Sequence, residues 1–212
     1  MTELTSVNPC EFMEIINELK RRPIEINNYR EKVGIGRSQC FGIVSKRSAH
    51  PDISRQSWKR AYLHYLLMDY AKKHVQIPFT SIQVNQDMMC AEHLDKSNVG
   101  LSYIVGFGEY TEGELCITDC KYNIRHQPLL FDGSKMLHKT EPWIGSRYTL
   151  VFHTIKPLPS YTLLVPPLTS YEAFEDTDKK WKLRDTRNDK VYWEKNGLDH
   201  PLKGRTKASF IA

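Results

Sequence analysis

Residues 79–85 read FTSIQVN and residues 100–108 read GLSYIVGFG, and these two stretches decide the fold class. Three further short runs share their character: GELCI (113–117), PLLFDG (128–133) and RYTLVFHT (147–154). All five runs are rich in β-branched and aromatic residues, and glycine, aspartate, asparagine and proline separate them. Short strands separated in this way are typical of a compact antiparallel β architecture, so we predict a sandwich or a barrel.

The residues before this region follow a helical period instead. Asn8 is a good N-cap and Pro9 suits a first helical position, which predicts a helix over 9–21. Ser54 is the expected cap of a second helix. We predict its buried side from residues at helical spacing, namely Trp58, Ala61, Tyr62, Tyr65, Leu66, Tyr70 and Ala71. The glycine-containing segment 33–47 favours a short hairpin or strand.

Composition limits the class of protein. The chain has 212 residues, 40% of them hydrophobic, which suffices for one domain with a continuous core. No apolar run reaches the roughly 18 residues that cross a bilayer, and the start MTELTSVNPCEF lacks the features of a secretory signal. The five cysteines form no CxxC pair, which indicates reduced thiols. We expect an intracellular protein, cytoplasmic or nuclear and not secreted, that does not span a membrane.

Much of the net charge of +5 lies near the C-terminus. Residues 176–212 contain ten lysines and arginines against six acidic residues. Such a surplus suits an anionic partner such as nucleic acid, and it also suits a solvated tail. We expect this tail either to wrap around the core or to stay mobile.

The sequence His93-Leu94-Asp95 is the first element of a candidate metal site. In an extended segment residues i and i+2 face the same side, so His93 and Asp95 can present an imidazole and a carboxylate together. His138 ends the run LLFDGSKMLH and could supply a third ligand. Two histidines and one carboxylate on one face of an octahedron form the ligand set of non-haem iron(II) oxygenases. A structural zinc site is less well matched, because it prefers thiolates.

Arg147 follows His138 by nine residues, enough for a turn and entry into a neighbouring strand. A guanidinium fork can hold the far carboxylate of 2-oxoglutarate through two hydrogen bonds. Thr149 shares the strand face of Arg147 and could add a third. Asn85, together with Gln83, could line the pocket or form an ordinary polar strand face, and Tyr103 could reach the co-substrate or be a buried core aromatic.

Residues 79–154 resemble the double-stranded β-helix core of the 2-oxoglutarate/iron(II) dioxygenase superfamily. The resemblance lies in HLD (93–95), GEL (113–115), FDG…LH (131–138) and RYTLVF (147–152). It implies an α+β fold with a jelly-roll core, and an oxidation coupled to decarboxylation of 2-oxoglutarate into succinate and carbon dioxide. We therefore expect His93, Asp95 and His138 to hold iron(II) and Arg147 to bind the co-substrate, with Thr149, Asn85 and Tyr103 as the further co-substrate candidates from strand spacing.

Two local resemblances point toward a substrate. The stretch CAEHLDKSN (90–98) resembles the TET/JBP nucleobase oxygenases, and RYTLVFH (147–153) resembles the AlkB-type segment, with His153 where AlkB proteins have a second arginine. The cysteine-rich region of TET enzymes is absent. A hydroxylase acting on a nucleobase of DNA or RNA is therefore the leading hypothesis. A prolyl-type protein side-chain hydroxylase is the main alternative, and a small-molecule hydroxylase the third.

A different class of protein, a binding module that kept this fold and lost its catalytic activity, should lack one of the metal-ligating residues. In this sequence every type of ligand is present.

We expect one globular domain in three parts. Residues 1–78 provide helices and short strands that pack on the core, residues 79–160 form the catalytic β-helix, and residues 161–212 form the basic extension. The expected partners are 2-oxoglutarate, dioxygen and a nucleic acid. The sequence does not set the oligomeric state.

Overall fold

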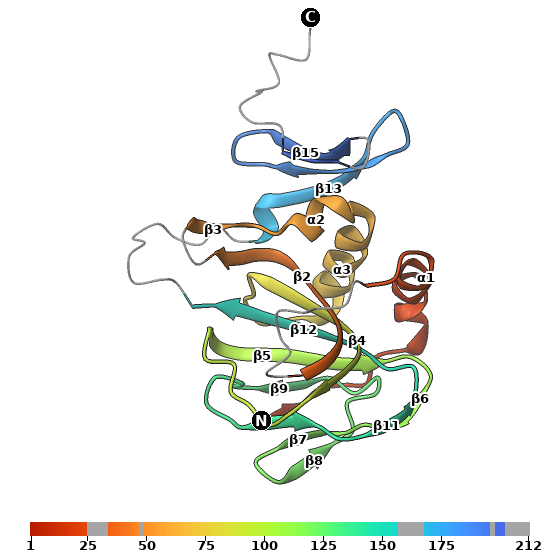
Figure 1. Cartoon of the computed structure of the whole chain (residues 1–212), viewed down its shortest axis with the longest axis vertical. Helices are drawn as coiled ribbons and strands as arrows, with labels where there is room; N and C mark the ends of the chain where they lie inside the picture. The colour runs from red at the N-terminus through yellow and green to blue at the C-terminus, as the bar shows by residue number, and fades with distance from the viewer. Residues whose placement is uncertain (25–33, 47–48, 157–167, 196–197, 202–212) are drawn as a thin grey trace, which may run out of the picture.

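The computed structural model of the chain describes residues 1–24, 34–46, 49–156, 168–195 and 198–201. Its largest feature is a seven-stranded antiparallel sheet, the main sheet, with strand order β1-β9-β5-β12-β4-β2-β3 (Figure 1). The strands of the main sheet are β1 (Thr2–Glu3), β2 (Gly34–Lys46), β3 (Ala49–Ile53), β4 (Ser81–Cys90), β5 (Asn98–Phe107), β9 (Leu129–Phe131) and β12 (Tyr148–Ile155).

Two smaller sheets lie at one end of the molecule (Figure 1). The minor sheet has the order β10-β7-β8, with β7 (Leu115–Ile117), β8 (Cys120–Tyr122) and β10 (His138–Thr140). A bridge between His93 and His138 adds the segment after β4 to the edge of this sheet. A separate ribbon pairs β6 (Tyr110–Glu112) with β11 (Trp143–Gly145).

The chain alternates between the main and the minor sheet. It leaves β4, passes the minor sheet at His93 and returns in β5; it then visits β7 and β8, returns in β9, visits β10 and ends the core in β12. Antiparallel strands shared between two sheets in this way form a jelly roll, or double-stranded β-helix. The predicted α+β fold with this core is confirmed, and the five predicted runs supply β4, β5, β7, β9 and β12.

The two faces of the main sheet have different environments. On β12, Leu150 and Phe152 are fully buried in the core that includes the helices. Thr149 and Val151 line a cavity on the opposite face. This alternation follows from the sequence, since successive strand residues point to opposite faces. A second apolar cluster on the cavity side comprises Ile104, Leu115, Ile117, Ile124, Leu129 and Phe131.

The first predicted helix is present. A 3-10 turn, η1 (Pro9–Phe12), leads into α1 (Met13–Arg21), and the Asn8 side chain caps it by accepting a hydrogen bond from the Cys10 N–H at 3.0 Å. Phe12 is fully buried and stacks on Phe107 of β5, with ring centroids 4.6 Å apart. Burying such a ring contributes about 1.5–3 kcal/mol toward holding this short helix on the sheet.

The second predicted helix is divided. Ser54 caps α2 (Arg55–Lys59) by accepting from the Ser57 N–H at 3.2 Å, as predicted, but α3 (Ala61–His74) is a separate helix. Between them Arg60 leaves the helical region, with φ −121° and ψ 50°, and its guanidinium donates to Gln39 Oε1 at 2.8 Å. A buried polar contact to the sheet thus interrupts a sequence that has the helical period throughout.

The C-terminal residues form a four-stranded antiparallel sheet next to α2 and α3 (Figure 1). After η3 (Leu168–Ser170) come β13 (Tyr171–Glu175), β14 (Trp181–Asp185), β15 (Lys190–Lys195) and β16 (Leu198–Pro201). Trp181 packs on Tyr62 and Tyr65 of α3, at 5.0 and 4.9 Å between ring centroids. This contact covers two aromatic residues that were expected in the core, and Tyr65 remains 43% exposed.

Two parts of the chain can be compared with their expected organisation. Segment 33–47 was expected to form a short hairpin or strand, and its described residues form one long strand, β2, which pairs with both β4 and β3, so the main sheet extends beyond residues 79–160. The described residues of 161–212 form η3 and a four-stranded sheet, while residues 161–167, 196–197 and 202–212 lie outside the described residues. None of the helices in the described part of the chain is both long and apolar enough to cross a membrane.

Candidate metal and anion site

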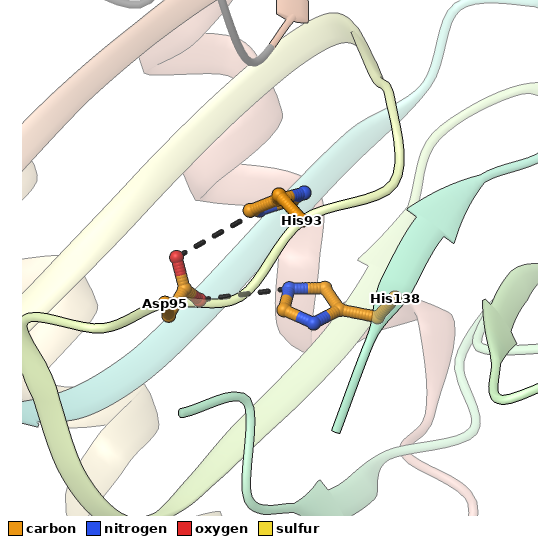
Figure 2. A group of neighbouring side chains, drawn as sticks. All are labelled: His93, Asp95 and His138. Atoms are coloured by element: carbon orange, nitrogen blue, oxygen red, sulfur yellow. Dashed lines mark ion pairs between the residues drawn. The ribbon is translucent and has the colours of Figure 1, made fainter. Parts of the chain in front are cut away.

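The backbone brings His93 and His138 together although 45 positions separate them. Each donates its backbone N–H to the other's carbonyl, at 3.0 and 3.1 Å, which makes them directly opposed residues of neighbouring strands. Side chains of such a pair project to the same face of the sheet. Asp95 is fixed beside them because its N–H donates to the carbonyl of Gly133 at 2.8 Å. Figure 2 shows the three side chains converging.

The three side chains are spaced as the ligands of one metal ion. Asp95 Oδ1 lies 3.7 Å from His93 Nε2, and Asp95 Oδ2 lies 3.6 Å from His138 Nε2 (Figure 2). Their ligand atoms all lie within 4.8 Å of one another. Ligands at about 2.1 Å from a common ion lie about 3–4 Å apart, so a small movement would complete the site. The predicted trio is therefore brought together.

Hydrogen bonds fix the tautomer of both histidines. His93 Nδ1 lies 2.7 Å from the Ala91 carbonyl, and His138 Nδ1 lies 2.9 Å from the Met136 carbonyl. A carbonyl oxygen can only accept, so each Nδ1 carries the hydrogen and each Nε2 presents its lone pair to the carboxylate side. Histidines that bind metals are oriented in this way by their second nitrogen. The residues present therefore fit a divalent cation.

Arg147 immediately precedes β12 and is held by several contacts. Its guanidinium lies over the rings of Tyr110 and Trp143, 5.6 and 5.5 Å from the ring centroids. Nε donates to the Gly113 carbonyl at 3.2 Å, and the backbone N–H donates to Asp87 Oδ1 at 2.8 Å. The β6–β11 ribbon thus clamps the guanidinium in one orientation, which suits the recognition of a planar carboxylate.

The electrostatic state of Arg147 indicates what it binds. The residue is 3% exposed, and burial lowers its pKa, although an arginine remains protonated. Burial raises the pKa of neighbouring Tyr110, with a smaller opposite effect from Arg147. Among the described residues no carboxylate forms an ion pair with Arg147. A buried cation that lacks a countercharge is costly, so this guanidinium is suited to an anionic ligand.

Both groups line the same cavity, which opens between the main and minor sheets. Its lining residues are Gln83, Asn85, Met88, Cys90, His93, Asp95, Asn98, Ile104, Leu115, Phe131, His138, Thr140, Arg147, Thr149, Val151 and His153. Of the predicted co-substrate residues, Arg147, Thr149 and Asn85 are thus at the cavity.

The structure does not bring Tyr103 to the cavity. Its hydroxyl is hydrogen-bonded to that of Tyr70 at 2.8 Å, and its ring packs edge-on against Phe152 in the helix-covered core. The next residue, Ile104, lines the cavity instead. Because neighbouring strand residues face opposite ways, only one of the two can reach the ligand side.

The sequence did not predict which other residues contact Arg147 and Asn85. Tyr110 and Trp143, which form the clamp around Arg147, lie on short strands whose pairing is not visible in the local pattern. Ser38 contacts the cavity residue Asn85 from β2, 47 positions away along the chain. Residues such as these are found only once the strand pairing is known.

Comparisons with known proteins give likenesses in structure alone. No protein-family model matches the chain, and no curated protein matches its sequence. Among solved structures, NgTET1 in complex with 5mC DNA is 16% identical with TM-score 0.47, over 69% of this chain and 67% of that one. A Pseudomonas putida prolyl-4-hydroxylase is 13% identical with TM-score 0.47, over 73% and 92%. OsALKBH1 is 12% identical with TM-score 0.47, over 72% and 96%.

Proposed function

We propose that the chain is an iron(II)- and 2-oxoglutarate-dependent oxygenase that hydroxylates its substrate. The observation that carries this proposal is that Arg147, buried and without an acidic partner among the described residues, shares a cavity with a metal-type trio. A metal site alone would suit many hydrolases or structural ions. A metal site combined with a buried anion-binding fork suits a ligand that chelates a metal at one end and carries a second anionic group.

In this proposal His93, Asp95 and His138 hold iron(II). Bound iron(II) and 2-oxoglutarate supply the activation of dioxygen, with 2-oxoglutarate converted to succinate and carbon dioxide. Arg147 binds the far carboxylate through two parallel hydrogen bonds, and Thr149 contributes one more. Apolar lining residues lower the polarity of the cavity, which strengthens the attraction between guanidinium and carboxylate. These are Ile104, Leu115, Phe131 and Val151.

The proposed substrate class is a nucleobase in DNA or RNA. Its support is the likeness of residues 90–98 and 147–153 to nucleobase oxygenases, and such a base must be unpaired or flipped out of its stack. The C-terminal sheet adds little support, because several of its basic residues are paired: Lys182 with Asp176, and Arg187 with Asp185 at 2.8 Å.

A direct test of the cofactor chemistry needs no knowledge of the substrate. The Fe(II)-loaded protein is titrated anaerobically with 2-oxoglutarate, and the visible metal-to-ligand charge-transfer band is followed. We expect a saturable band in the wild type that is absent in His138→Ala. The band should be retained in the control His74→Ala, which removes a histidine that lies outside the cavity. If the folded, iron-bound wild type shows no band, the oxygenase proposal is refuted and a binding module is the remaining hypothesis.

Substrate class is tested separately by succinate formation. Single-stranded and duplex oligonucleotides are compared with proline-containing peptides at equal concentration. We expect oligonucleotides to stimulate succinate formation, most strongly where their bases are unpaired. Stimulation by peptides alone would replace the nucleobase proposal with protein side-chain hydroxylation while keeping the cofactor chemistry.

A further inference from the structure

Three polar side chains form a row across the cavity face of the main sheet. Ser38 on β2 lies directly opposite Asn85 on β4, and Asn85 lies directly opposite Thr149 on β12. Cross-strand partners of this kind point to the same face. Ser38 is 5% exposed and Thr149 is 3% exposed, so their hydroxyl groups are shielded from bulk water.

Hydrogen bonds run along this row in one direction. Gln83 Nε2 donates to Ser38 Oγ at 2.5 Å, Ser38 Oγ donates to Asn85 Oδ1 at 2.7 Å, and Asn85 Nδ2 donates to Thr149 Oγ1 at 3.0 Å. An amide nitrogen can only donate and an amide oxygen can only accept, so an Asn85 amide that accepts from Ser38 presents its nitrogen to Thr149. The Thr149 hydroxyl is therefore an acceptor toward Asn85, and its own hydrogen remains for another partner.

The hydrogen of the Thr149 hydroxyl is available to a ligand in the cavity. Thr149 lines the cavity next to Arg147, and among the described residues no other hydrogen bond involves its hydroxyl group. A carboxylate held by Arg147 offers oxygen lone pairs and no donor. A threonine that presents its hydrogen is complementary to such a group, whereas one that presents its lone pairs would repel it.

We propose that Ser38 is a positioning residue for the co-substrate, fixing the orientation of the Asn85 amide so that Thr149 donates to the far carboxylate of 2-oxoglutarate. This inference rests on the proposed function. Ser38 acts through Asn85 and does not itself line the cavity. It lies on β2, outside the region expected to form the catalytic core.

Loss of Ser38 has a defined consequence for Asn85. With the serine hydroxyl removed, nothing holds Asn85 Oδ1 toward β2, and a half-turn of the amide allows it to accept from Thr149. Each orientation then keeps one hydrogen bond between Asn85 and Thr149, so the two forms should be about equally populated. In the rotated form the Thr149 hydrogen points away from the ligand, so about half of the protein is competent to bind the carboxylate and the affinity falls about twofold.

The test measures ligand binding, not turnover. Fe(II)-loaded wild type, Ser38→Ala, Thr149→Val and the double variant are titrated anaerobically with 2-oxoglutarate and with pyruvate, which lacks the far carboxylate. We expect Ser38→Ala to weaken 2-oxoglutarate binding about twofold and to leave pyruvate binding unchanged. In the Thr149→Val background, Ser38→Ala should have no further effect, because the hydroxyl that it orients is gone.

Ser102→Ala is the matched control, since Ser102 is a buried serine on β5 whose hydroxyl has no partner among the described residues. It should leave both affinities unchanged. Equal 2-oxoglutarate affinity in wild type and Ser38→Ala, an equal loss for pyruvate, or multiplicative effects in the double variant would each overturn the positioning role alone. A wild type with no saturable signal would overturn both this inference and the proposed function.

Discussion

Arg147→Met should stabilise the ligand-free protein while abolishing 2-oxoglutarate binding. The guanidinium is almost completely buried and has no carboxylate partner among the described residues. Methionine has a similar length, is apolar and can occupy the space between the rings of Tyr110 and Trp143. Its introduction leaves no orphaned acid behind, which is the usual reason why removing a buried charge destabilises a protein.

The magnitude follows from opposing contributions. Burying a cation without a countercharge costs several kcal/mol, roughly 5, and methionine avoids this cost. Against this, the variant loses two cation–π contacts of about 1–2 kcal/mol each and leaves the Gly113 carbonyl without its donor, at about 1 kcal/mol. These losses offset most of the gain, so we expect a net stabilisation of about 1 kcal/mol, or roughly 2–4 °C in melting temperature for a chain of this size.

The assay is thermal and urea unfolding of the protein without metal or co-substrate, repeated with both present. Wild type should melt lower than Arg147→Met when ligand-free and should gain stability on adding Fe(II) and 2-oxoglutarate beyond the gain from Fe(II) alone; the variant should show no such extra gain. Arg125→Met is the control, because Arg125 packs on the same tyrosine at 5.5 Å but is partly exposed and lies 3.7 Å from Glu109. A ligand-free Arg147→Met that is less stable than wild type by more than about 1 kcal/mol would refute the reasoning.

Three further outcomes are expected. Gly113→Ala should weaken 2-oxoglutarate binding at least severalfold in the same titration, because φ is +73° and the new Cβ would lie 2.8 Å from Trp143 Cβ and 3.2 Å from Arg147 Nε; unchanged affinity would contradict the clamp. Asp95→Asn keeps the side-chain shape but removes its charge, so calorimetry should show strongly reduced divalent-metal affinity with an unchanged circular dichroism spectrum, and retained affinity would exclude the trio. Burial lowers the pKa of His64 to about 4 from 6.5. Between these two pH values the unfolded chain binds a proton at His64 that the folded protein does not bind. The free energy of unfolding therefore decreases as pH falls from about 6.5 to 4, by up to about 3 kcal/mol. Urea unfolding of His64→Leu should lack this part of the pH dependence, and an identical pH profile would show that His64 is not responsible.

Local sequence patterns predicted the strands and, on β12, the direction of each side chain. The alternation of Arg147 and Thr149 with Leu150 and Phe152 shows directly which residues face the ligand side. The spacing of His93 and Asp95 places both side chains at the candidate metal site. These features depend on neighbours within a few residues, so a single sequence contains the information for them.

Features that depend on strand pairing were not predictable in the same way. Tyr103 lies in the run YIVGF, which is apolar on both faces and gives no alternation from which to choose a side. Ser38 reaches Asn85 only because β2 pairs with β4 in one particular register. The division of the second helix at Arg60 likewise follows from its contact with Gln39 on the sheet. Each of these outcomes depends on a tertiary contact that overrides or supplements the local pattern.

The polar groups of the cavity have opposite hydrogen-bonding character at its two ends, and this limits which ligands can enter. At the metal end, two Nε2 lone pairs and a carboxylate can bind only a cation, whose charge then attracts an anionic chelating group. At the other end, Arg147 and the Thr149 hydroxyl can only donate toward the ligand. With bound metal, both ends favour negative charge, and several of the lining residues are apolar. A small dicarboxylate with an apolar middle meets all three conditions. An oxo-acid with one carboxylate would leave the buried guanidinium unpaired and should bind far more weakly, so we expect the Arg147 end to determine the selectivity of the proposed site more than the metal end does.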